Sequence, residues 1–491
     1  MNDSASHLRR LKDAPEHICD CTFTYIYAVV RIIYKVMKKI TILLFVLLLS
    51  LPMLAIGVGG SGMFQWSVEL RGYVSKETGK APVAYLWIPE GCKKVKVTIL
   101  CQQNMTEETI FKMPSFQRHM QKLGVAVIWV APSFTNTWDP QTNCQGVFLE
   151  MMTGLAAQSG HPEIEHGAII PLGHSAQATF PWNFAAWNND RTLCIISFHG
   201  DAPRTNLCGY GTANVEWGRS RNIDGIPGLM IVGEYEWWEA RVNPALAFRM
   251  MYPESCVSFL CDTGRGHFDC SQETADYIAL FIEKSLRYRM QTNGTLQKLN
   301  PKKGKFFHRF VPDLPQTDRG ATTFSSPADY GCGEPCTHNN FWYFDQEMVD
   351  ITARRYASTK GKKIQYVGVE QKGKLLPYDE KLQGGMTAEF LPEKDGLTLK
   401  FKDVLTDSTH QRPIASRGKN RGRLSIETIS GPVCKINDTT FHIYPYEAGW
   451  DNPRRSFRIW LVAVAQGDSQ YKSAVQPFYI DLPRDIILRL K

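Results

Sequence analysis

The 491-residue chain lacks internal repeats, long low-complexity tracts, and runs of Lys and Arg interleaved with aromatic residues. Without repeats or biased tracts, its composition is that of an ordinary globular protein, and its length allows two or three domains with cores of their own. The absence of basic, aromatic-rich runs argues against nucleic-acid binding. The formal net charge of +8 at pH 7 makes the whole chain only mildly basic.

An apolar segment near the N-terminus is typical of a secretory signal peptide. Met37-Lys-Lys is followed by an apolar run, residues 40–50, and by small residues near Ala55 and Gly57. A charged start, an apolar centre and small residues at the cleavage position are the three parts of such a signal. We therefore interpret residues 1–57 as an over-called start followed by a signal peptide that begins at Met37. This interpretation predicts a secreted or periplasmic protein.

An uncleaved membrane anchor is the alternative, because residues 22–36 are also fairly apolar. Arg31 and Lys35 interrupt that run, so we expect cleavage and no stable membrane association afterwards. The cleavage region contains no cysteine, which argues against a lipid anchor. Residues 1–55 carry seven Lys/Arg and four Asp/Glu, and subtracting them from the totals of 56 and 48 leaves a net charge of +5.

The cysteines do not reveal a pattern of disulfide bonds. Eleven of the thirteen cysteines follow the signal segment, an odd number scattered along the chain. An exported protein can pair some of them, but the sequence does not show which. Cys332, Cys336 and His338 look like part of a metal site, but a fourth ligand at suitable spacing is missing. A disulfide or an ordinary loop fits that segment better, so we predict no metal and no organic cofactor.

Residues 168–178 combine a short apolar run, a serine and the start of a helix-compatible segment. The run 168–172 leads into Gly173-His174-Ser175, and residues 176–187 favour a helix. A strand, a tight turn with serine at its tip and a helix form the context of a nucleophile elbow, which exposes the hydroxyl above the sheet. The usual pattern G-x-S-x-G ends in glycine, whereas Gln177 stands there in this chain. An ordinary turn with an exposed serine is the alternative.

Two downstream loops place an acid and a histidine after predicted strands. The apolar run 227–233 is followed by Glu234 and Glu236, and the run 256–261 is followed by a loop that contains His267. Loops after parallel strands share one edge of a sheet, so these side chains can converge on one site. The order serine, carboxylate, histidine along the chain is one that serine hydrolases use.

With these residues in this order, the chain resembles the α/β-hydrolase superfamily over about residues 64–290. In that family the loop after the acid strand often reads Gly-Glu-x-Asp, so the string 233–236 implies Glu236 as the acid of a Ser175–His267–Glu236 triad. The family also takes oxyanion-hole N–H groups from the loop after the third strand and from the residue after the nucleophile, which implies Gln103 and Ala176. The region 173–290 is further similar to secreted bacterial esterases that act on plant polysaccharides, including a pectin methylesterase group.

The pattern of strands and helices predicts an α/β fold followed by an all-β region. Alternating strands and helices over residues 64–290 indicate a mainly parallel sheet with helices on both faces, here an α/β-hydrolase catalytic domain. Residues 291–360 are expected to form a linker with a short helix, 344–356. Residues 361–491 contain six predicted strands without a helix between them, which indicates an immunoglobulin-like β-sandwich.

The loop 200–225 is predicted to border the site and to bind substrate through Arg204, Trp217, Arg219 and Arg221. In α/β-hydrolases, insertions at this place cover the active site and select the substrate. An aromatic face beside guanidinium groups suits a sugar ring that carries a carboxylate. The alternatives are a core position for the tryptophan and ion pairs between the arginines and acidic residues of the same loop.

These observations predict a secreted serine carboxylic-ester hydrolase that acts on a decorated plant polysaccharide or oligosaccharide, with pectin methyl esters as the first choice. An acetyl or feruloyl carbohydrate esterase is the nearest alternative. A serine peptidase of the oligopeptidase type is less favoured, because no propeller domain precedes the catalytic domain. A catalytically inactive glycan-binding protein is a further alternative, which the absence of the elbow glycine favours. All three residue types of the triad are nevertheless present in order. The sequence does not identify the ester group or the sugar backbone.

Overall fold

The structure is a computed structural model that describes 63–76, 78–206, 213–219, 222–236, 239–312, 339–371, 374–376, 385–393, 396–404, 423–431, 433–443 and 458–481. All of these residues belong to one unit of the chain, Gly57–Lys491. The predicted signal peptide lies outside the described residues. Within the described part, we find no helix with both the length and the apolar character that a membrane span requires.

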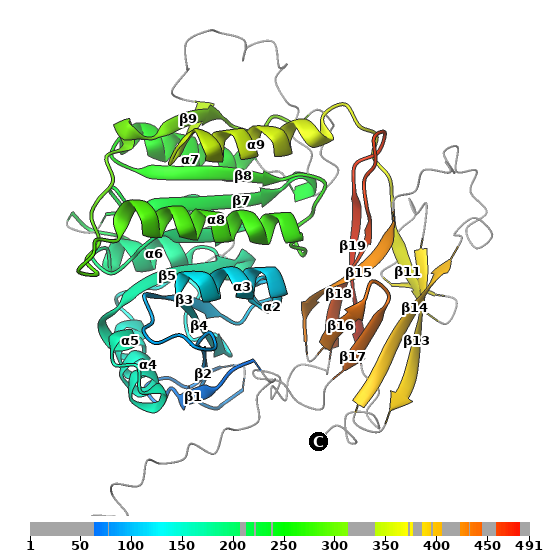
Figure 1. Cartoon of the computed structure of the whole chain (residues 1–491), viewed down its shortest axis with the longest axis horizontal. Coiled ribbons are helices and arrows are strands. Elements are labelled where there is room, and N and C mark those ends of the chain that lie inside the picture. The colour runs from blue at the N-terminus through cyan, green and yellow to red at the C-terminus, as the bar shows by residue number, and fades with distance from the viewer. Residues whose placement is uncertain are drawn as a thin grey trace, which may run out of the picture. The chain divides into compact units, whose positions relative to one another are not determined.

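The first part of the chain forms an eight-stranded, mainly parallel sheet (Figure 1). The spatial order of its strands is β1-β2-β4-β3-β5-β6-β7-β8. The pairs β1–β2 and β2–β4 are antiparallel, and all the other pairs are parallel. This confirms the predicted mainly parallel sheet. The alternation of apolar and polar residues over 94–101 also predicts an antiparallel third strand, which is wrong, because β3 is parallel to both of its neighbours, β4 and β5. The strands are β1 (Trp66–Glu69), β2 (Val83–Trp87), β3 (Val97–Gln102), β4 (Val125–Ala131), β5 (Ala168–His174), β6 (Ile195–Phe198), β7 (Pro227–Gly233) and β8 (Cys256–Asp262).

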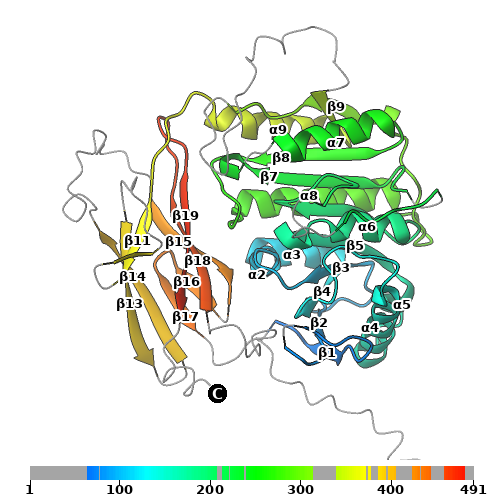
Figure 2. The same ribbon diagram turned by 180° about the vertical axis from the view of Figure 1, so that it is seen from behind.

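Helices cover both faces of this sheet (Figures 1 and 2). Strand β4 shows why: Val125, Val127 and Trp129 belong to one hydrophobic cluster, whereas the alternate residues Ala126 and Ile128 belong to another. Successive side chains of a strand point to opposite faces, so both faces of the sheet are buried under helices. The helices are α2 (Glu107–Lys112), α3 (Pro114–Leu123), α4 (Cys144–Ser159), α5 (Glu163–His166), α6 (Phe180–Trp187), α7 (Glu239–Met251), α8 (Gln272–Arg289) and α9 (Gln346–Thr359).

Local signals set the ends of two helices at the predicted residues. Helix α3 begins with Pro114, which lacks the N–H that the first turn cannot pair, and it ends before Gly124 at φ +70°. Helix α8 begins after Ser271, whose side chain accepts a hydrogen bond from the Thr274 N–H. The sequence pattern predicts helices at 114–123 and 272–289, and the structure confirms both with the same bounds.

The segment predicted as a linker is part of the α/β core where the structure describes it. Strands β9 (Lys305–His308) and β10 (Asn340–Tyr343) form an antiparallel pair, and α9 follows. The Tyr343 hydroxyl donates to the carbonyl oxygen of Phe259 in β8 at 2.6 Å. Phe341, Trp342 and Tyr343 are buried in the same cluster as the sheet. The linker prediction was wrong here, because four consecutive aromatic residues, 341–344, bury a large apolar area against β8 and α8.

The rest of the described chain is all β. One sheet has the strand order β12-β11-β13-β14-β17-β16, and a second has the order β15-β18-β19. Residues of both sheets share one hydrophobic cluster. The strands are β11 (Gly368–Gln371), β12 (Lys374–Leu376), β13 (Gly385–Glu393), β14 (Gly396–Val404), β15 (Leu424–Ser430), β16 (Val433–Asn437), β17 (Thr440–Ile443), β18 (Arg458–Ala465) and β19 (Ala474–Asp481).

Each of the six strands predicted in this region has a counterpart, but β12, β13 and β16 were missed. Strand β16 lies at the edge of its sheet, and four of its five residues are exposed. Such a strand does not show the apolar alternation that identifies a half-buried one.

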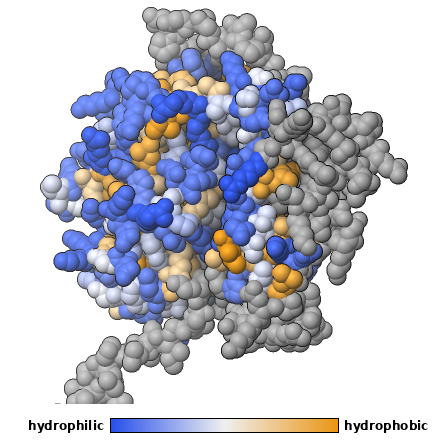
Figure 3. Space-filling view, turned by 45° about the vertical axis from the view of Figure 1, so that its right-hand side comes forward, coloured by the Kyte–Doolittle hydropathy of each residue, from blue (hydrophilic) through white to orange (hydrophobic). Residues whose placement is uncertain are grey.

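The face of the molecule in Figure 3 is mostly hydrophilic with scattered hydrophobic areas, as is usual for a folded protein.

Candidate active site

Ser175 lies at a tight turn between β5 and a short 3-10 helix, η1 (Ser175–Gln177). Its backbone φ is +52°, a value that non-glycine residues rarely adopt and that is enriched at functional sites. A Cβ at Gly173 would come within 2.0 Å of the Gln177 carbonyl oxygen, so the turn needs glycine there. The structure therefore has the backbone of a nucleophile elbow.

Gln177, at the place of the missing pattern glycine, is buried, and its side chain has a polar partner. Its Nε2 donates to Asn136 Oδ1 at 2.6 Å. The close approach that small residues permit occurs one residue later. A Cβ at Gly200, after β6, would lie 2.1 Å from the Ala178 Cβ. Ala178 and Gly200 thus supply the small surfaces between the elbow and the neighbouring strand.

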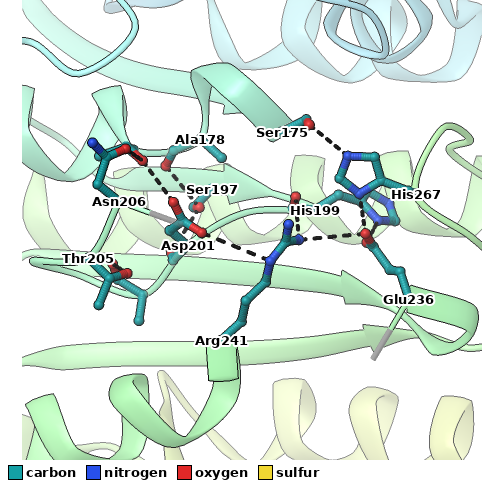
Figure 4. Close-up of polar contacts among 12 residues, drawn as sticks. Ser175, Ala178, Ser197, His199, Asp201, Thr205, Asn206, Glu236, Arg241 and His267 are labelled. Carbon is teal, nitrogen blue, oxygen red and sulfur yellow. Dashed lines mark hydrogen bonds and ion pairs between the residues drawn. The ribbon is translucent and has the colours of Figure 1, made fainter. Parts of the chain in front are cut away.

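The structure brings together the three residues of the predicted triad (Figure 4). His267 Nε2 lies 2.6 Å from Ser175 Oγ, and His267 Nδ1 hydrogen-bonds to Glu236 Oε2. These residues follow β5, β8 and β7, whose carboxyl ends lie at one edge of the sheet. A hydroxyl, an imidazole and a carboxylate in this chain of contacts have the geometry of an activated serine nucleophile.

Glu236, in the short helix η2 (Glu234–Glu236), is a buried carboxylate with four donors around it. Oε1 accepts from the Gly233 N–H at 3.0 Å and from His199 Nδ1, and Oε2 contacts His267 and, at 3.5 Å, Arg241 Nη1. Burial by itself raises the pKa of this carboxyl, but the charges of His267 and His199 and their hydrogen bonds outweigh it and hold the pKa well below its usual range. Glu236 is therefore ionised at neutral pH.

His199 is a member of this site that the sequence analysis missed. It directly follows β6, has a φ of +48°, and is fully buried. Burial lowers the pKa of the imidazole, but the charge of Glu236 and its hydrogen bond more than offset this and raise the pKa above its ordinary value. Its place at the carboxyl end of a central strand was the one signal in the sequence.

Arg241, on α7, links the acid to the elbow helix. Its Nη1 donates to the His199 carbonyl oxygen at 3.0 Å, and its Nε lies 3.9 Å from Asp201 Oδ1. Asp201 Oδ2 in turn accepts from the hydroxyl of Thr179, the residue immediately before α6, at 2.9 Å. These buried contacts connect Glu236 to the helix that follows the nucleophile.

His174, the residue before the nucleophile, connects the elbow to the loop that carries His267. Its Nε2 lies 2.7 Å from the carbonyl oxygen of His267, and Asn104 Nδ2 lies 3.2 Å from its Nδ1. Burial holds the pKa of His174 well below its ordinary value, so its ring is neutral and donates through Nε2. The His174 N–H donates to Glu107 Oε1 at 2.8 Å, which attaches the elbow to α2.

The oxyanion-hole prediction was wrong for Gln103. Its N–H donates to the Val130 carbonyl oxygen at 2.7 Å and therefore continues the pairing of β3 with β4. The next N–H along the chain belongs to Asn104, whose side-chain Nδ2 donates to the His174 carbonyl oxygen at 2.7 Å. Within the described residues, the N–H groups of Asn104 and Ala176 have no hydrogen-bond partner. Asn104 replaces Gln103 as the candidate donor beside Ala176.

Two of the predicted substrate-binding residues, Trp217 and Arg204, lie away from the triad. Trp217 is 5% exposed and packs in the main core, with its Nε1 donating to Asn183 at 2.6 Å, so its ring does not face a ligand. Arg204 lies at the other end of α7 from Glu236, where it binds the Tyr252 hydroxyl at 2.5 Å and Glu216 at 3.5 Å. Both outcomes match the alternatives considered for this loop. Arg219 is exposed, and Arg221 lies outside the described residues.

Three side chains of the site are close enough together to be compared with a metal centre. One ligand atom each of His199, Glu236 and His267 lies within 4.8 Å of the others, a spacing that could hold a metal ion. Both histidine Nδ1 atoms, however, hydrogen-bond to the Glu236 carboxylate. Cys332, Cys336 and His338 lie outside the described residues. The described cysteines are all free thiols: Cys92, Cys101, Cys144, Cys194, Cys256, Cys261, Cys270 and Cys434.

Searches of known proteins found similarity only among solved structures, since no family profile and no curated protein sequence matches this chain. FphF, a fluorophosphonate-binding serine hydrolase of Staphylococcus aureus, is 14% identical with a TM-score of 0.32, over 45% of this chain and 97% of that one. Est1E of Butyrivibrio proteoclasticus is 14% identical with a TM-score of 0.30, over 45% and 100%. The siderophore hydrolase EstA of Aspergillus nidulans is 9% identical with a TM-score of 0.31, over 46% and 96%. Likenesses this distant do not decide the function, which has to come from the geometry of the triad.

Proposed function

We propose that this protein is a serine ester hydrolase whose nucleophile is Ser175. The observation that carries the proposal is the continuous set of contacts from Ser175 Oγ to His267 Nε2, at 2.6 Å, and from His267 Nδ1 to the buried Glu236 carboxylate. The strained backbone of Ser175 supports it, because a φ of +52° in a serine is favoured where the side chain has a task.

The reaction follows from these positions. As Ser175 Oγ attacks the ester carbonyl carbon, His267 Nε2 takes the hydroxyl proton, and the carbonyl oxygen becomes an oxyanion. The N–H groups of Ala176 and Asn104 would donate to that oxygen, and the loss of one such donor in other enzymes costs about 3–4 kcal/mol of transition-state stabilisation. The intermediate collapses when the C–O bond of the leaving alcohol breaks, and His267 returns the proton to that alcohol.

Water then completes the cycle. His267 Nε2 removes a proton from the water as it attacks the acyl-enzyme carbonyl, and the same proton returns to Ser175 Oγ when the acid is released. Throughout, Glu236 keeps the Nδ1 proton of His267 in place and stabilises the imidazolium. His199, Arg241 and the Gly233 N–H hold the carboxylate in one orientation.

For the substrate, we propose an ester on a plant polysaccharide, with methyl-esterified pectin as the first to test and with acetyl and feruloyl esters next. This proposal comes from the resemblance of residues 173–290 to secreted polysaccharide esterases, and with it comes secretion or a periplasmic location. Arg204 does not support the choice of an acidic sugar backbone, because its side chain contacts Tyr252 and Glu216. A panel that scores methanol, acetate and hydroxycinnamate release separates the three ester classes.

The test of the serine mechanism is a pair of variants, Ser175→Ala and His267→Ala, assayed on a small activated ester. Each should lower kcat by a factor of about 10⁴ or more while thermal unfolding changes little, because both side chains act in the reaction rather than in the core. Ser358→Ala, which changes an exposed serine on α9, is the matched control and should keep wild-type activity. Near wild-type turnover in Ser175→Ala would exclude the serine mechanism.

A further inference from the structure

Three loops of the candidate site contact the all-β region of the chain. We name them the acid turn (234–236), the base loop (263–270) and the oxyanion loop (103–106). The contacts come from the sheet β15-β18-β19 and from the loop between β18 and β19, residues 466–473. The hydrogen bonds among them join residues 162 or 238 positions apart in the chain.

The acid turn makes the most buried of these contacts. Lys472 Nζ forms an ion pair with Glu234 Oε1, and the two side chains are 0% and 3% exposed. The other carboxylate oxygen of Glu234 accepts from the Gly264 N–H at 2.8 Å, so Glu234 also attaches the acid turn to the base loop. The Tyr235 hydroxyl donates to the Ser473 carbonyl oxygen. Two consecutive residues of the turn are thus attached to two consecutive residues of the β18–β19 loop.

The base loop and the neighbourhood of the oxyanion loop contact the same sheet. Arg265 Nη1 binds Glu427 of β15 at 3.1 Å, and the Phe268 ring, next to His267, stacks on Trp460 of β18 with centroids 6.4 Å apart. Met105 belongs to the same apolar cluster as Phe268 and Trp460. The acid turn, the base loop and the oxyanion loop must keep a fixed geometry for catalysis, and all three contact the sheet β15-β18-β19 or its β18–β19 loop.

We propose that Lys472 is a positioning residue for the catalytic acid: its ion pair with Glu234 holds the acid turn so that Glu236 faces His267. This inference depends on the proposed function. Glu236 is two residues after Glu234 within the three residues of η2, so a displacement of Glu234 moves the Glu236 carboxylate. In enzymes, a misplacement of about 1 Å can reduce the rate about a hundredfold. The all-β region then completes the active site.

The physical reason that Lys472 can act in this way is the cost of an unpaired buried charge. Removal of one partner of a buried ion pair leaves the other charge without compensation, which is strongly destabilising. Without the ammonium group, Glu234 must take up a proton or move toward water. Either change weakens the contacts of the acid turn with Gly264 and alters the position of Glu236.

The test compares Lys472→Met with the double variant Glu234→Gln/Lys472→Met, which removes both charges of the pair. Lys472→Met should lower kcat by a factor of about 10 to 100 with KM within about threefold, because the acid is misplaced while substrate contacts stay. The double variant should recover part of this loss, because no unpaired charge remains. If Lys472→Met does not fold, the double variant is assayed alone and should still lower kcat by more than about threefold at unchanged KM, because the acid turn has lost its ion pair with the β18–β19 loop; wild-type kcat in it overturns the inference.

Lys284→Met is the matched control. Lys284 is also a buried lysine, 4% exposed, and pairs with Asp345 at 2.6 Å and with Glu347, away from the three loops. It should lose stability and keep kcat. The inference is overturned if Lys472→Met keeps kcat within about threefold of wild type, if Lys284→Met loses as much kcat, or if the double variant shows no recovery over a folded single variant. Ser175→Ala separates the two proposals, because an active Ser175→Ala protein contradicts the proposed function itself.

Discussion

The substitution Glu236→Gln should inactivate this protein by forcing the wrong tautomer on His267. The two oxygens of Glu236 have different neighbours, and this decides how the amide of Gln would sit. Oε1 accepts from the Gly233 N–H at 3.0 Å, so an amide NH₂ placed there would face another donor. Oε2 has Arg241 Nη1 only at 3.5 Å, and that group already donates to the His199 carbonyl oxygen at 3.0 Å. The amide oxygen therefore takes the place of Oε1, and the NH₂ group faces His267 Nδ1, where Oε2 is now.

An NH₂ group beside Nδ1 makes this nitrogen an acceptor, so the ring proton moves to Nε2. Nε2 is the atom 2.6 Å from Ser175 Oγ, and once protonated it cannot take the serine proton. The same error of tautomer in a serine protease triad lowers kcat about 10⁴-fold. At 1.36 kcal/mol for each factor of ten, this corresponds to about 5.5 kcal/mol of transition-state stabilisation.

The assay is kcat on a small activated ester, with the ¹⁵N chemical shifts of the His267 ring as a direct report of the tautomer. Glu234→Gln is the control, because Glu234 contacts Gly264 and Lys472 but not His267. It acts only through the position of the acid turn, so its loss in kcat should not exceed about a hundredfold. The reasoning is refuted if Glu236→Gln keeps kcat within tenfold of wild type, or if Glu234→Gln loses more.

Three further changes test other parts of the structure. His199→Gln should lower the free energy of unfolding more at pH 6 than at pH 9 in urea titrations. A histidine whose pKa is raised in the folded state stabilises the protein below its unfolded-state pKa of about 6.5, and this stabilisation is lost as the pH rises through its folded-state pKa. An equal loss of stability at both pH values contradicts a charged His199. Gly173→Ala should destabilise the protein by about 1–3 kcal/mol or more and lower kcat, because the new Cβ would lie 2.0 Å from a backbone oxygen, and unchanged urea unfolding would speak against this turn. Trp217→Ala should lower the free energy of unfolding by about 3–5 kcal/mol and leave KM for pectin unchanged, because Trp217 is a buried core residue. A raised KM at unchanged stability would instead indicate that Trp217 binds substrate.

Much of the catalytic constellation could be predicted because its signals are local. Ser175, Glu236 and His267 each follow an apolar run that forms a strand, and parallel strands bring their carboxyl ends to one edge whatever the details of packing. Helices α3 and α8 were also predicted with their bounds, because proline, glycine and serine at their ends act on the adjacent backbone. Such signals depend on a few neighbouring residues, which the sequence displays directly.

Other features needed the tertiary structure, because they depend on contacts between distant segments. The N–H of Gln103 is excluded from the oxyanion hole by its pairing with Val130, and a shift of one residue in that loop is not visible in the sequence. Trp217 is buried because α6 and α7 residues surround it, although a Gly-rich loop carries it. Lys472 and Glu234 are 238 positions apart. The sequence determined which chemical groups are present and in what order, whereas packing at long range decided which of them meet, because burial and charge pairing act between residues that no local pattern connects.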